Sequence, residues 1–163
     1  MDFRIRKLSE GDRTAVVDIF NHFVEYSFAA YPAKKVGYGF FEYLKETARG
    51  DSFYVIESPE AQVIGFGLLR KYHGGSIFHR AAELAYFIMP AYGNRGLGTK
   101  LLTALLSDAT KMGVETVLAS ISSLNAASLN FHRKNGFAEC GRFKRVGKKN
   151  GRDFDVIWMQ RFI

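Results

Sequence analysis

The stretch "AYGNRGLGTKLL", residues 91–102, decides the fold, because three closely spaced glycines lead directly into an apolar helical pattern. Before it, "AAELAYFIMP", residues 81–90, is an apolar run closed by a proline, which is typical of a strand buried on both faces. After the helical pattern, "VETVLASI", residues 114–121, predicts another strand. A strand, a helix and a strand in this order predict a parallel pair with a right-handed crossover.

Further strands and helices are predicted on both sides of this unit. The helices begin at Asp12, near Phe40 and at Asn125, and the last ends at Gly136. The other strands cover residues 3–8, 52–58, 63–72, 137–146 and 152–162. Two turn signals, "PEAQ" and "KKNG", join four of these strands into hairpins. The sequence therefore predicts an α/β protein with a mixed sheet, in which hairpins flank one central parallel pair.

The composition is that of one ordinary globular domain spanning residues 1–163. No window resembles a signal peptide or a membrane span, and Cys140 is the sole cysteine, so we expect a cytoplasmic protein without disulfides. The formal charge of +7 favours an anionic partner or simply keeps the protein soluble. The basic residues are scattered, and their densest group, residues 142–152, is interpreted as a solvated hairpin rather than a nucleic-acid surface.

The glycine turn is predicted to bind a diphosphate. A helix start exposes backbone N–H groups without intrahelical partners, and glycines let a phosphate approach the main chain. The spacing differs from a dinucleotide fingerprint and from a Walker loop. The residues offered are Asn94, Arg95, Gly96, Leu97, Gly98 and Thr99. A glycine-rich turn that binds nothing is the alternative.

The buried strand, the glycine turn, the amphipathic helix and the later "SSLNAASLNFHRKNGF" together resemble the GCN5-related N-acetyltransferases, the GNAT superfamily. In that family Q/R-x-x-G-x-G/A receives the diphosphate of acetyl-CoA. "DIFNHFVEYSFAAY", "AELAYFIMP" and the C-terminal 40 or so residues are most similar to the phosphinothricin and methionine sulfone acetyltransferase branch. The resemblance implies a GNAT-like fold of about seven mostly antiparallel strands and about four helices. One position departs from the motif: Gly93 stands where Arg or Gln is usual, and Arg95 is expected to supply the cation.

Two residues are predicted to handle protons. An alkylamine must lose a proton before it attacks a thioester, and Glu83 is the only acidic residue between Glu60 and Asp108. The resembling branch keeps a glutamate there. His132 occupies the slot where many family members have the tyrosine that protonates the departing thiolate, and the branch also has His there. The alternatives are a solvated strand-edge carboxylate and a histidine that only packs on its helix.

Acetyl-CoA is the expected cosubstrate, and no metal site is expected. The backbone of Phe87, Ile88 and Met89 is predicted to pair with the pantetheine amides. Asn125 and Ser128 are further cofactor candidates, although helix capping explains Asn125 nearly as well. The acceptor candidates are Phe28, Tyr31 and Arg80, of which Arg80 offers a fork for a carboxylate.

The sequence thus predicts an N-acetyltransferase that transfers directly to a small amine, such as an amino acid or its phosphinic or sulfone analogue. No nucleic-acid or membrane partner is expected, and the branch resemblance suggests a homodimer. Two alternatives stay open. One is acetylation of a peptide or protein amine by the same fold, and the other is a non-catalytic module that binds CoA or nucleic acid.

Overall fold

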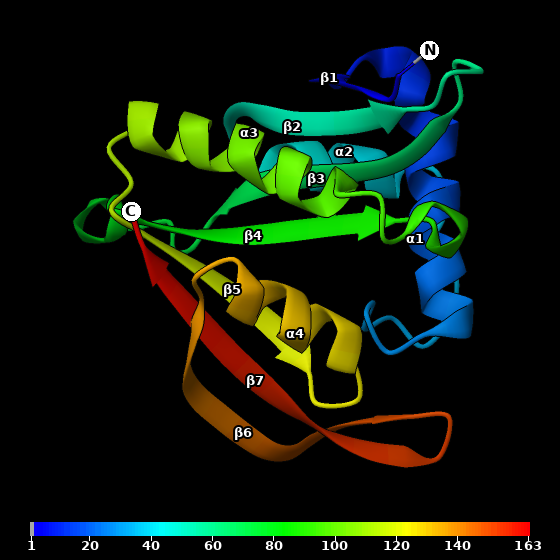
Figure 1. Ribbon diagram of the computed structural model, residues 1–163. Helices are drawn as coiled ribbons and strands as arrows, with labels where there is room; N and C mark the ends of the chain where they lie inside the picture. The colour runs from blue at the N-terminus through cyan, green and yellow to red at the C-terminus, as the bar shows by residue number, and fades with distance from the viewer. Residues whose placement is uncertain (1) are drawn as a thin grey trace.

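The computed structural model describes residues 2–163, which form one seven-stranded sheet with helices on both faces (Figure 1). The strand order is β1-β2-β3-β4-β5-β7-β6, and every neighbouring pair is antiparallel except β4–β5. The strands are β1 (Arg4–Lys7), β2 (Ala48–Glu57), β3 (Val63–Lys71), β4 (Ala81–Ile88), β5 (Thr116–Ser122), β6 (Ala138–Lys149) and β7 (Arg152–Phe162). The predicted mixed sheet with one central parallel pair is confirmed.

Four helices cover the sheet, α1 (Arg13–Tyr26) and α2 (Phe40–Thr47) on one face and α3 (Leu97–Lys111) and α4 (Ala126–Lys134) on the other. In Figure 1, α3 and α4 lie in front of the sheet and α2 lies behind it. Three short 3-10 turns, Glu10–Asp12, Ser76–Phe78 and Pro90–Tyr92, complete the described elements. The order of helices and strands predicted from the sequence is confirmed.

Each face of the sheet has its own apolar core. Leu101, Leu102 and Leu105 of α3 are fully buried against the face of the sheet that α3 covers, where the helix contacts β2, β3 and β4. On the opposite face, Val16 and Val17 of α1 pack with Phe41 of α2 and with the central strands. Because side chains alternate along a strand, residues two apart on β4 face the same core. Leu84 and Tyr86 thus belong to the α3 side, and Ala85 and Phe87 to the α1 side.

Three strand boundaries differ from the prediction for reasons that the structure shows. Strand β2 begins at Ala48 rather than residue 52, since a bulge that includes Gly50 at φ +60° carries the polar segment into the sheet. Strand β4 stops at Ile88, because Pro90 opens a 3-10 turn. Strand β6 continues to Lys149 through two irregularities in its pairing with β7. Bulges insert residues that break the alternation on which the prediction relied.

Candidate active site

The central feature of the site is the separation of β4 from β5. Their parallel pairing joins Ala81–Glu83 to Thr116–Leu118 and stops there. Beyond this point the two strands carry different partners, β3 for β4 and β7 for β5. The separation opens the sheet between the two helical layers.

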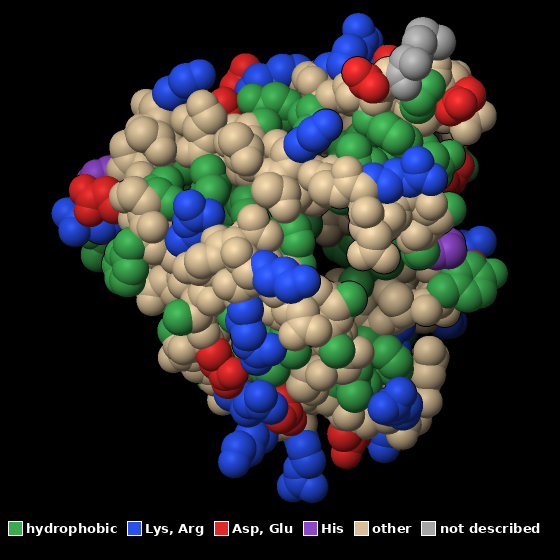
Figure 2. All heavy atoms as spheres, in the orientation of Figure 1, with side chains coloured by type: hydrophobic (Ala, Val, Ile, Leu, Met, Phe, Trp, Pro, Cys, Tyr) green, Lys and Arg blue, Asp and Glu red, His purple; other side chains and the backbone are tan. Residues whose placement is uncertain are grey.

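A cavity of about 330 Å³ lies at this opening. One wall comes from the segment after α1 and from α2, and the other from β5 and α4. The lining includes Phe20, Ala29, Ala30, Tyr31, Pro32, Phe40, Tyr43, Leu44, Leu68, Arg70, Leu84, Ala85, Tyr86, Phe87, Ala119, Ser120, Ile121, Ser122, Asn125, Ser128 and His132. The cavity therefore touches residues of both sheet faces, and space-filling atoms show a hollow between the start of α3 and α4 (Figure 2).

Glu83 is the last residue of β4 that pairs with β5, and on the other side it lies directly opposite Arg70 of β3. Its carboxylate is 3.5 Å from the Arg70 guanidinium and its side chain is 17% exposed. Burial raises the pKa of Glu83, and the positive charge of Arg70 opposes that rise. A carboxylate with a raised pKa beside a cavity is suited to accept a proton near neutral pH.

Tyr31 and its neighbours in the segment after α1 form one wall of the cavity. Its hydroxyl lies 3.4 Å from the Ser120 hydroxyl, and its ring stacks on Phe154 of β7 at 5.8 Å between centroids. Burial raises the pKa of Tyr31, so the phenol stays protonated. Phe28, also predicted to contact the acceptor, instead packs edge-on against Phe154, behind the lining residues.

A buried lysine fixes the same wall. Lys149, at the end of β6, is 7% exposed and donates to the carbonyl oxygens of Ser27 and Ala30, each at 2.7 Å. Burial lowers its pKa. The β6–β7 hairpin therefore holds the segment that carries Tyr31.

His132 lies on the opposite wall, 3% exposed, with both ring nitrogens occupied. Nδ1 is 2.7 Å from the Ser128 carbonyl oxygen, which only accepts, so Nδ1 carries the proton. Nε2 then accepts from the hydroxyl of Tyr86. Burial lowers the pKa of His132 and raises that of Tyr86, so the pair is neutral.

Asn125 and Ser128 have identifiable structural roles. The Asn125 side chain caps α4 by accepting from the Ser128 backbone N–H at 3.2 Å, as the capping alternative expected. The Ser128 hydroxyl lies 3.3 Å from His132 Nδ1. Both residues also line the cavity, so capping leaves them available to a ligand.

The start of α3 presents unpartnered amides. The first helical bond runs from the Lys100 N–H to the Gly96 carbonyl, so the N–H groups of Leu97, Gly98 and Thr99 have no partner within the helix. Gly96 has φ +73°, and a Cβ placed there would meet nothing within 4 Å. Asn94 is also left-handed, at φ +58°. These features fit an anion such as a diphosphate.

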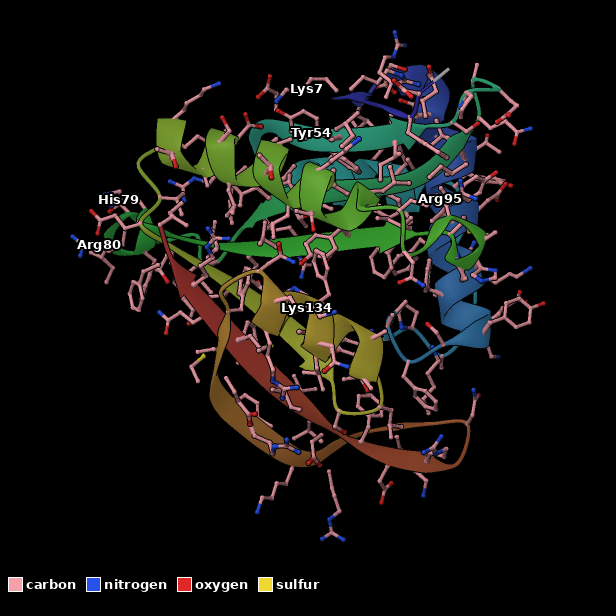
Figure 3. The ribbon with its side chains drawn as sticks, viewed as in Figure 1. Lys7, Tyr54, His79, Arg80, Arg95 and Lys134 are labelled. Carbon is pink, nitrogen blue, oxygen red and sulfur yellow. The ribbon has the colours of Figure 1, made fainter. Side chains whose placement is uncertain are left out.

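The glycine at position 98 has a different physical reason. A Cβ on Gly98 would approach the Phe131 ring of α4 to 3.0 Å. The residue is therefore small because α3 and α4 pack closely. The backbone N–H groups of residues 94–99 are called the cradle below. Arg95 lies at this cradle in Figure 3, with its guanidinium 5.7 Å from the ring centroid of Phe3 and 5.9 Å from that of Tyr92.

Beyond Glu83, every second residue of β4 directs its backbone N–H and C=O groups toward the opening. Met89 donates its N–H to Ile64 of β3, so residues of odd number direct their backbone groups toward β3. The amides of Leu84, Tyr86 and Ile88 consequently face the gap. Of the three residues predicted to pair with the pantetheine, Ile88 alone turns its backbone toward the opening, whereas Phe87 and Met89 bond within the sheet.

Arg80 lies elsewhere. It is absent from the cavity lining, and its side chain is 63% exposed and pairs with Glu115 at 3.5 Å. Figure 3 shows Arg80 and His79 at the opposite end of the sheet from Arg95. The prediction that Arg80 contacts the acceptor is therefore corrected: it belongs to the short turn before β4, which points away from the opening.

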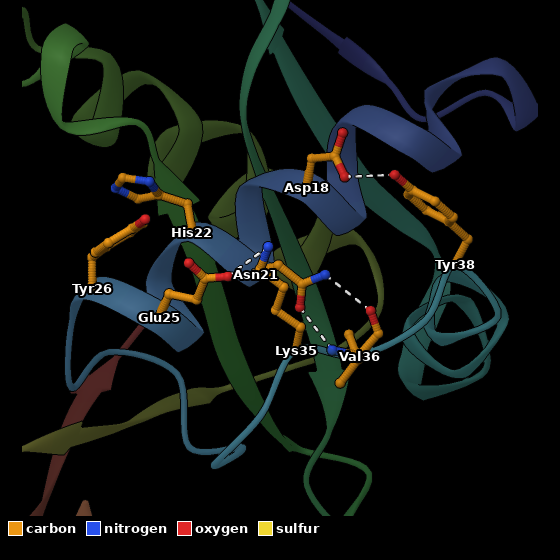
Figure 4. A pocket seen from close by; sticks show the side chains of 8 residues that line it. All are labelled: Asp18, Asn21, His22, Glu25, Tyr26, Lys35, Val36 and Tyr38. Atoms are coloured by element: carbon orange, nitrogen blue, oxygen red, sulfur yellow. Dashed lines mark hydrogen bonds and ion pairs between the residues drawn. The ribbon is translucent and has the colours of Figure 1, made fainter. Parts of the chain in front are cut away.

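A second hollow, of about 450 Å³, lies outside α1 and is lined by Asp18, Asn21, His22, Glu25, Tyr26, Lys35, Val36 and Tyr38 (Figure 4). Its polar groups bond to one another. Asn21 binds both backbone groups of Val36, Glu25 pairs with Lys35 and Asp18 accepts from Tyr38. These contacts attach the segment before α2 to α1 and occupy the polar groups just named, while the rings of His22 and Tyr26 contact each other at 5.1 Å between centroids.

The sequence analysis missed Arg70, Tyr86 and Lys149. Arg70 could have been found by pairing the strand at 63–72 with the one at 81–90, since their register places it opposite Glu83. Tyr86 and Lys149 carried no local signal. Across residues 2–163, no group of three or more His, Cys, Asp or Glu side chains is arranged to hold a metal ion.

Comparison with known proteins identifies the family. The model of the acetyltransferase (GNAT) family matches residues 16–137, which include both walls of the cavity and the start of α3. The chain belongs to this family. This confirms the predicted superfamily, its acetyltransferase fold and acetyl-CoA as the acetyl donor.

Curated relatives support the branch suggested by the sequence. The chain is 31% identical to the L-methionine sulfoximine/L-methionine sulfone acetyltransferase of Salmonella typhimurium, over 96% of this chain and 92% of the relative. It is 32% identical to the L-amino acid N-acyltransferase of Escherichia coli, over 96% of this chain and 91% of that protein. The branch assignment is confirmed.

Solved structures of similar proteins have the same fold. An acetyltransferase of Salmonella typhimurium, crystallised with its cofactor acetyl-CoA, has a TM-score of 0.88 at 28% identity and covers 99% of this chain and 94% of its own. A ribosomal-protein-alanine N-acetyltransferase of Brucella melitensis has a TM-score of 0.87 at 32% identity, covering 98% and 99%. In the part of this chain that the structure describes, no helix has the length and apolar character to cross a membrane.

Proposed function

We propose that this N-acetyltransferase transfers the acetyl group of acetyl-CoA directly to the amine of a small amino acid or analogue, such as phosphinothricin, methionine sulfone or methionine sulfoximine. The observation that carries the proposal is the single cavity at the β4–β5 separation. It brings Arg70 on the α1 side and the Tyr86–His132 pair on the α4 side to one space, with Glu83 beside it. The names of the similar proteins point to the same class of acceptor.

The donor would be held by the cradle at the start of α3. The proposed contacts are the N–H groups of residues 94–99, with Arg95 adding positive charge. The outward amides of β4, Ile88 among them, would pair with the pantetheine arm, with Asn125 and Ser128 on the other side of the opening. A thioester placed there is a reactive carbonyl close to Glu83.

The reaction forms a C–N bond and breaks the C–S bond, so the amine loses a proton and the thiolate gains one. Glu83 is proposed as the base that takes the amine proton, directly or through a water. Its raised pKa, caused by burial, suits this task.

The thiolate proton is proposed to come from the side of His132. In the neutral ring Nε2 has no proton to give, because it accepts from Tyr86 and Nδ1 is bound to Ser128. The proton proposed for the thiolate is therefore the hydroxyl proton of Tyr86, which His132 Nε2 accepts in this structure and so holds in place. The hydroxyl turns to the sulfur, its O–H bond breaks as the S–H bond forms, and the tyrosinate regains a proton from solvent. The two residues act as one unit in the proposal, which extends the acid assigned to His132 alone.

The decisive experiment measures release of CoA thiol by the intact protein with acetyl-CoA and a panel of amino acids, analogues and short peptides. Glu83→Gln should lower kcat by about 100-fold or more, since general base catalysis contributes ~10²–10⁴. Binding of CoA, measured by calorimetry, should change less than twofold. Glu115→Gln, which removes an exposed carboxylate, is the matched control.

Absence of thiol release with every amine would overturn the proposal. Faster turnover of peptide N-termini than of any free amino acid would reassign the acceptor to a protein or peptide. Full activity of Glu83→Gln would remove Glu83 as the base while leaving the transferase assignment standing.

We also propose that the enzyme is a homodimer in the cytoplasm. Strand β6 is an edge strand exposed over most of its length, and Phe143 and Val146 on it are 59% and 58% exposed. The exposed free thiol of Cys140 suits a reducing compartment. Light scattering during gel filtration should give twice the chain mass; a monomer at all concentrations would contradict the assembly.

A further inference from the structure

Arg70 is placed where an acceptor would lie, although the mechanism above assigns it no contact with a substrate. It lines the cavity from β3 and is the cross-strand neighbour of Glu83. Its guanidinium Nη2 is 3.5 Å from the Glu83 carboxylate, longer than a good charge-assisted hydrogen bond. The contact therefore leaves most of the guanidinium donors unused.

One of those donors is buried without a partner. The Arg70 Nε atom is inaccessible to solvent and makes no hydrogen bond. The two terminal Nη groups make no hydrogen bond within residues 2–163 either, but they are not shielded from solvent. Together they present a pair of N–H donors that matches the two oxygens of a carboxylate. A ligand that covers them must supply acceptors, because a buried donor without an acceptor costs about 1–3 kcal/mol.

The same sheet face continues as an apolar surface. Leu68 precedes Arg70 by two residues on β3, and Phe87 follows Glu83 by four residues on β4. Phe20 of α1 and Phe40 of α2 complete this surface, with ring centroids 4.7 Å apart and Phe20 edge-on to Phe87. The described lining on this side carries no acidic group and no cation besides Arg70.

We propose that Arg70 determines specificity by binding the α-carboxylate of an amino acid acceptor, whose apolar side chain lies among Phe20, Phe40 and Phe87. This inference rests on the proposed function and narrows it to apolar α-amino acids. With the carboxylate at Arg70, the α-amine lies next to Glu83, the neighbouring side chain on β4. Binding also gives the unbonded Nη groups of Arg70 the acceptors that they lack.

The test compares acceptors that differ in the carboxylate alone. L-leucine and 3-methylbutylamine share one side chain, and L-glutamate adds a charge at its end. The wild-type protein should prefer L-leucine over 3-methylbutylamine by at least about 100-fold in kcat/KM, as expected for about 2.7 kcal/mol from a bidentate charged pair. It should use L-glutamate poorly.

Arg70→Gln should abolish the preference, because KM for L-leucine should rise at least tenfold more than KM for 3-methylbutylamine. It should also move the acidic limb of the pH profile with 3-methylbutylamine to higher pH, because the charge that opposes the rise in the Glu83 pKa is gone. A purely structural role would not produce that shift. Arg80→Gln, which removes an exposed arginine paired with Glu115, is the matched control and should change neither acceptor.

Equal use of L-leucine and 3-methylbutylamine by the wild-type protein would overturn the inference and leave the acetyltransferase assignment intact. An equal loss for both acceptors in a folded Arg70→Gln protein would do the same. If Arg70→Gln fails to fold, Arg70→Lys replaces it and should raise KM for L-leucine about tenfold more than KM for 3-methylbutylamine. Absence of turnover with every amine would instead refute the proposed function. The inference about Arg70 would then be tested by calorimetry of L-leucine with the CoA-saturated protein. Binding that is lost in the Arg70 variant would support the inference, and absence of binding to the wild-type protein would refute it.

Discussion

At the scale of single residues, the site depends on groups whose pKa values are shifted by burial. Glu83 and His132 are both removed from solvent, and burial disfavours the charged form of each, so the carboxyl pKa rises and the imidazole pKa falls. The two groups lie on opposite sides of the separated strands. The proposed base and the proposed acid therefore lie on different sides of the opening.

The pH dependence of catalysis follows from the sign of the Glu83 shift. A base works when deprotonated, so kcat/KM should fall as pH drops through the raised pKa of Glu83. The acidic limb should therefore lie above the ordinary glutamate value of about 4.3. A pH–rate profile checks this, and a limb at or below the ordinary value would show that another group is the base.

The pH dependence of stability follows from His132. Its folded-state pKa is lowered, so the unfolded chain binds more protons once the pH falls below about 6.5. The contribution of His132 to the free energy of unfolding should be constant above that value and decrease as pH falls from it toward the folded-state pKa. Urea titrations between pH 8 and 5 measure the slope, and His132→Asn should flatten it; an unchanged slope in the variant would assign it to other groups.

At the scale of elements, two glycines of the same turn serve different purposes. Gly96 needs its left-handed conformation to begin α3, whereas Gly98 needs its small size to let α4 approach. The sequence presents both as parts of one motif, and the contact of Gly98 with Phe131 separates them.

Substitution distinguishes the two glycines. Gly96→Ala should weaken CoA binding at least tenfold, because a Cβ and a strained φ are placed at the cradle, with a loss of stability of about 1–2 kcal/mol. Gly98→Ala should lower stability by about 1 kcal/mol, since overpacking against Phe131 exceeds the gain in helix propensity.

The double variant provides the control. In a Phe131→Leu background the ring is gone, and Gly98→Ala should become neutral or stabilising. Calorimetric binding of CoA and urea denaturation give the two readouts. Equal effects of Gly98→Ala with and without Phe131 would contradict the packing argument.

At the scale of the whole molecule, distant parts of the chain cooperate to form the cavity wall proposed to receive the acceptor. Lys149 and Phe154, on the last hairpin, hold the segment after α1 through Ser27, Ala30 and Tyr31. The N-terminal helical pair and the C-terminal hairpin are joined there across the opening.

Removing the Lys149 ammonium should loosen this wall. Lys149→Met should lower the free energy of unfolding by about 2–3 kcal/mol, because charged hydrogen bonds to two carbonyl groups are lost. KM for the acceptor should rise while the Kd of CoA stays unchanged, since the cradle at α3 lies on the opposite face. Urea denaturation, steady-state kinetics and calorimetry measure these three quantities. Lys148→Met, which changes an exposed neighbour, is the control. A loss of CoA affinity as large as the rise in KM for the acceptor would contradict a local role for Lys149.

The local pattern determined the elements and the cofactor turn. Alternation, apolar periodicity and the glycine spacing depend on residues near one another in the chain, so the strand order along the sequence, the helices and the amides at Gly96 could be read directly. Glu83 was found because it is an isolated acid in an apolar strand, and its catalytic role stays a prediction.

Tertiary structure alone decided which side chains share the cavity. Whether Arg70 or Arg80 approaches the acceptor depends on the register between β3 and β4, and bulges elsewhere in the sheet show how easily register departs from alternation. The partnership of Tyr86 with His132 and the reach of Lys149 across more than 100 residues depend on how separate elements pack. Contacts between distant residues leave no mark on local spacing, and the separation of β4 from β5 arises because each strand follows a different neighbour.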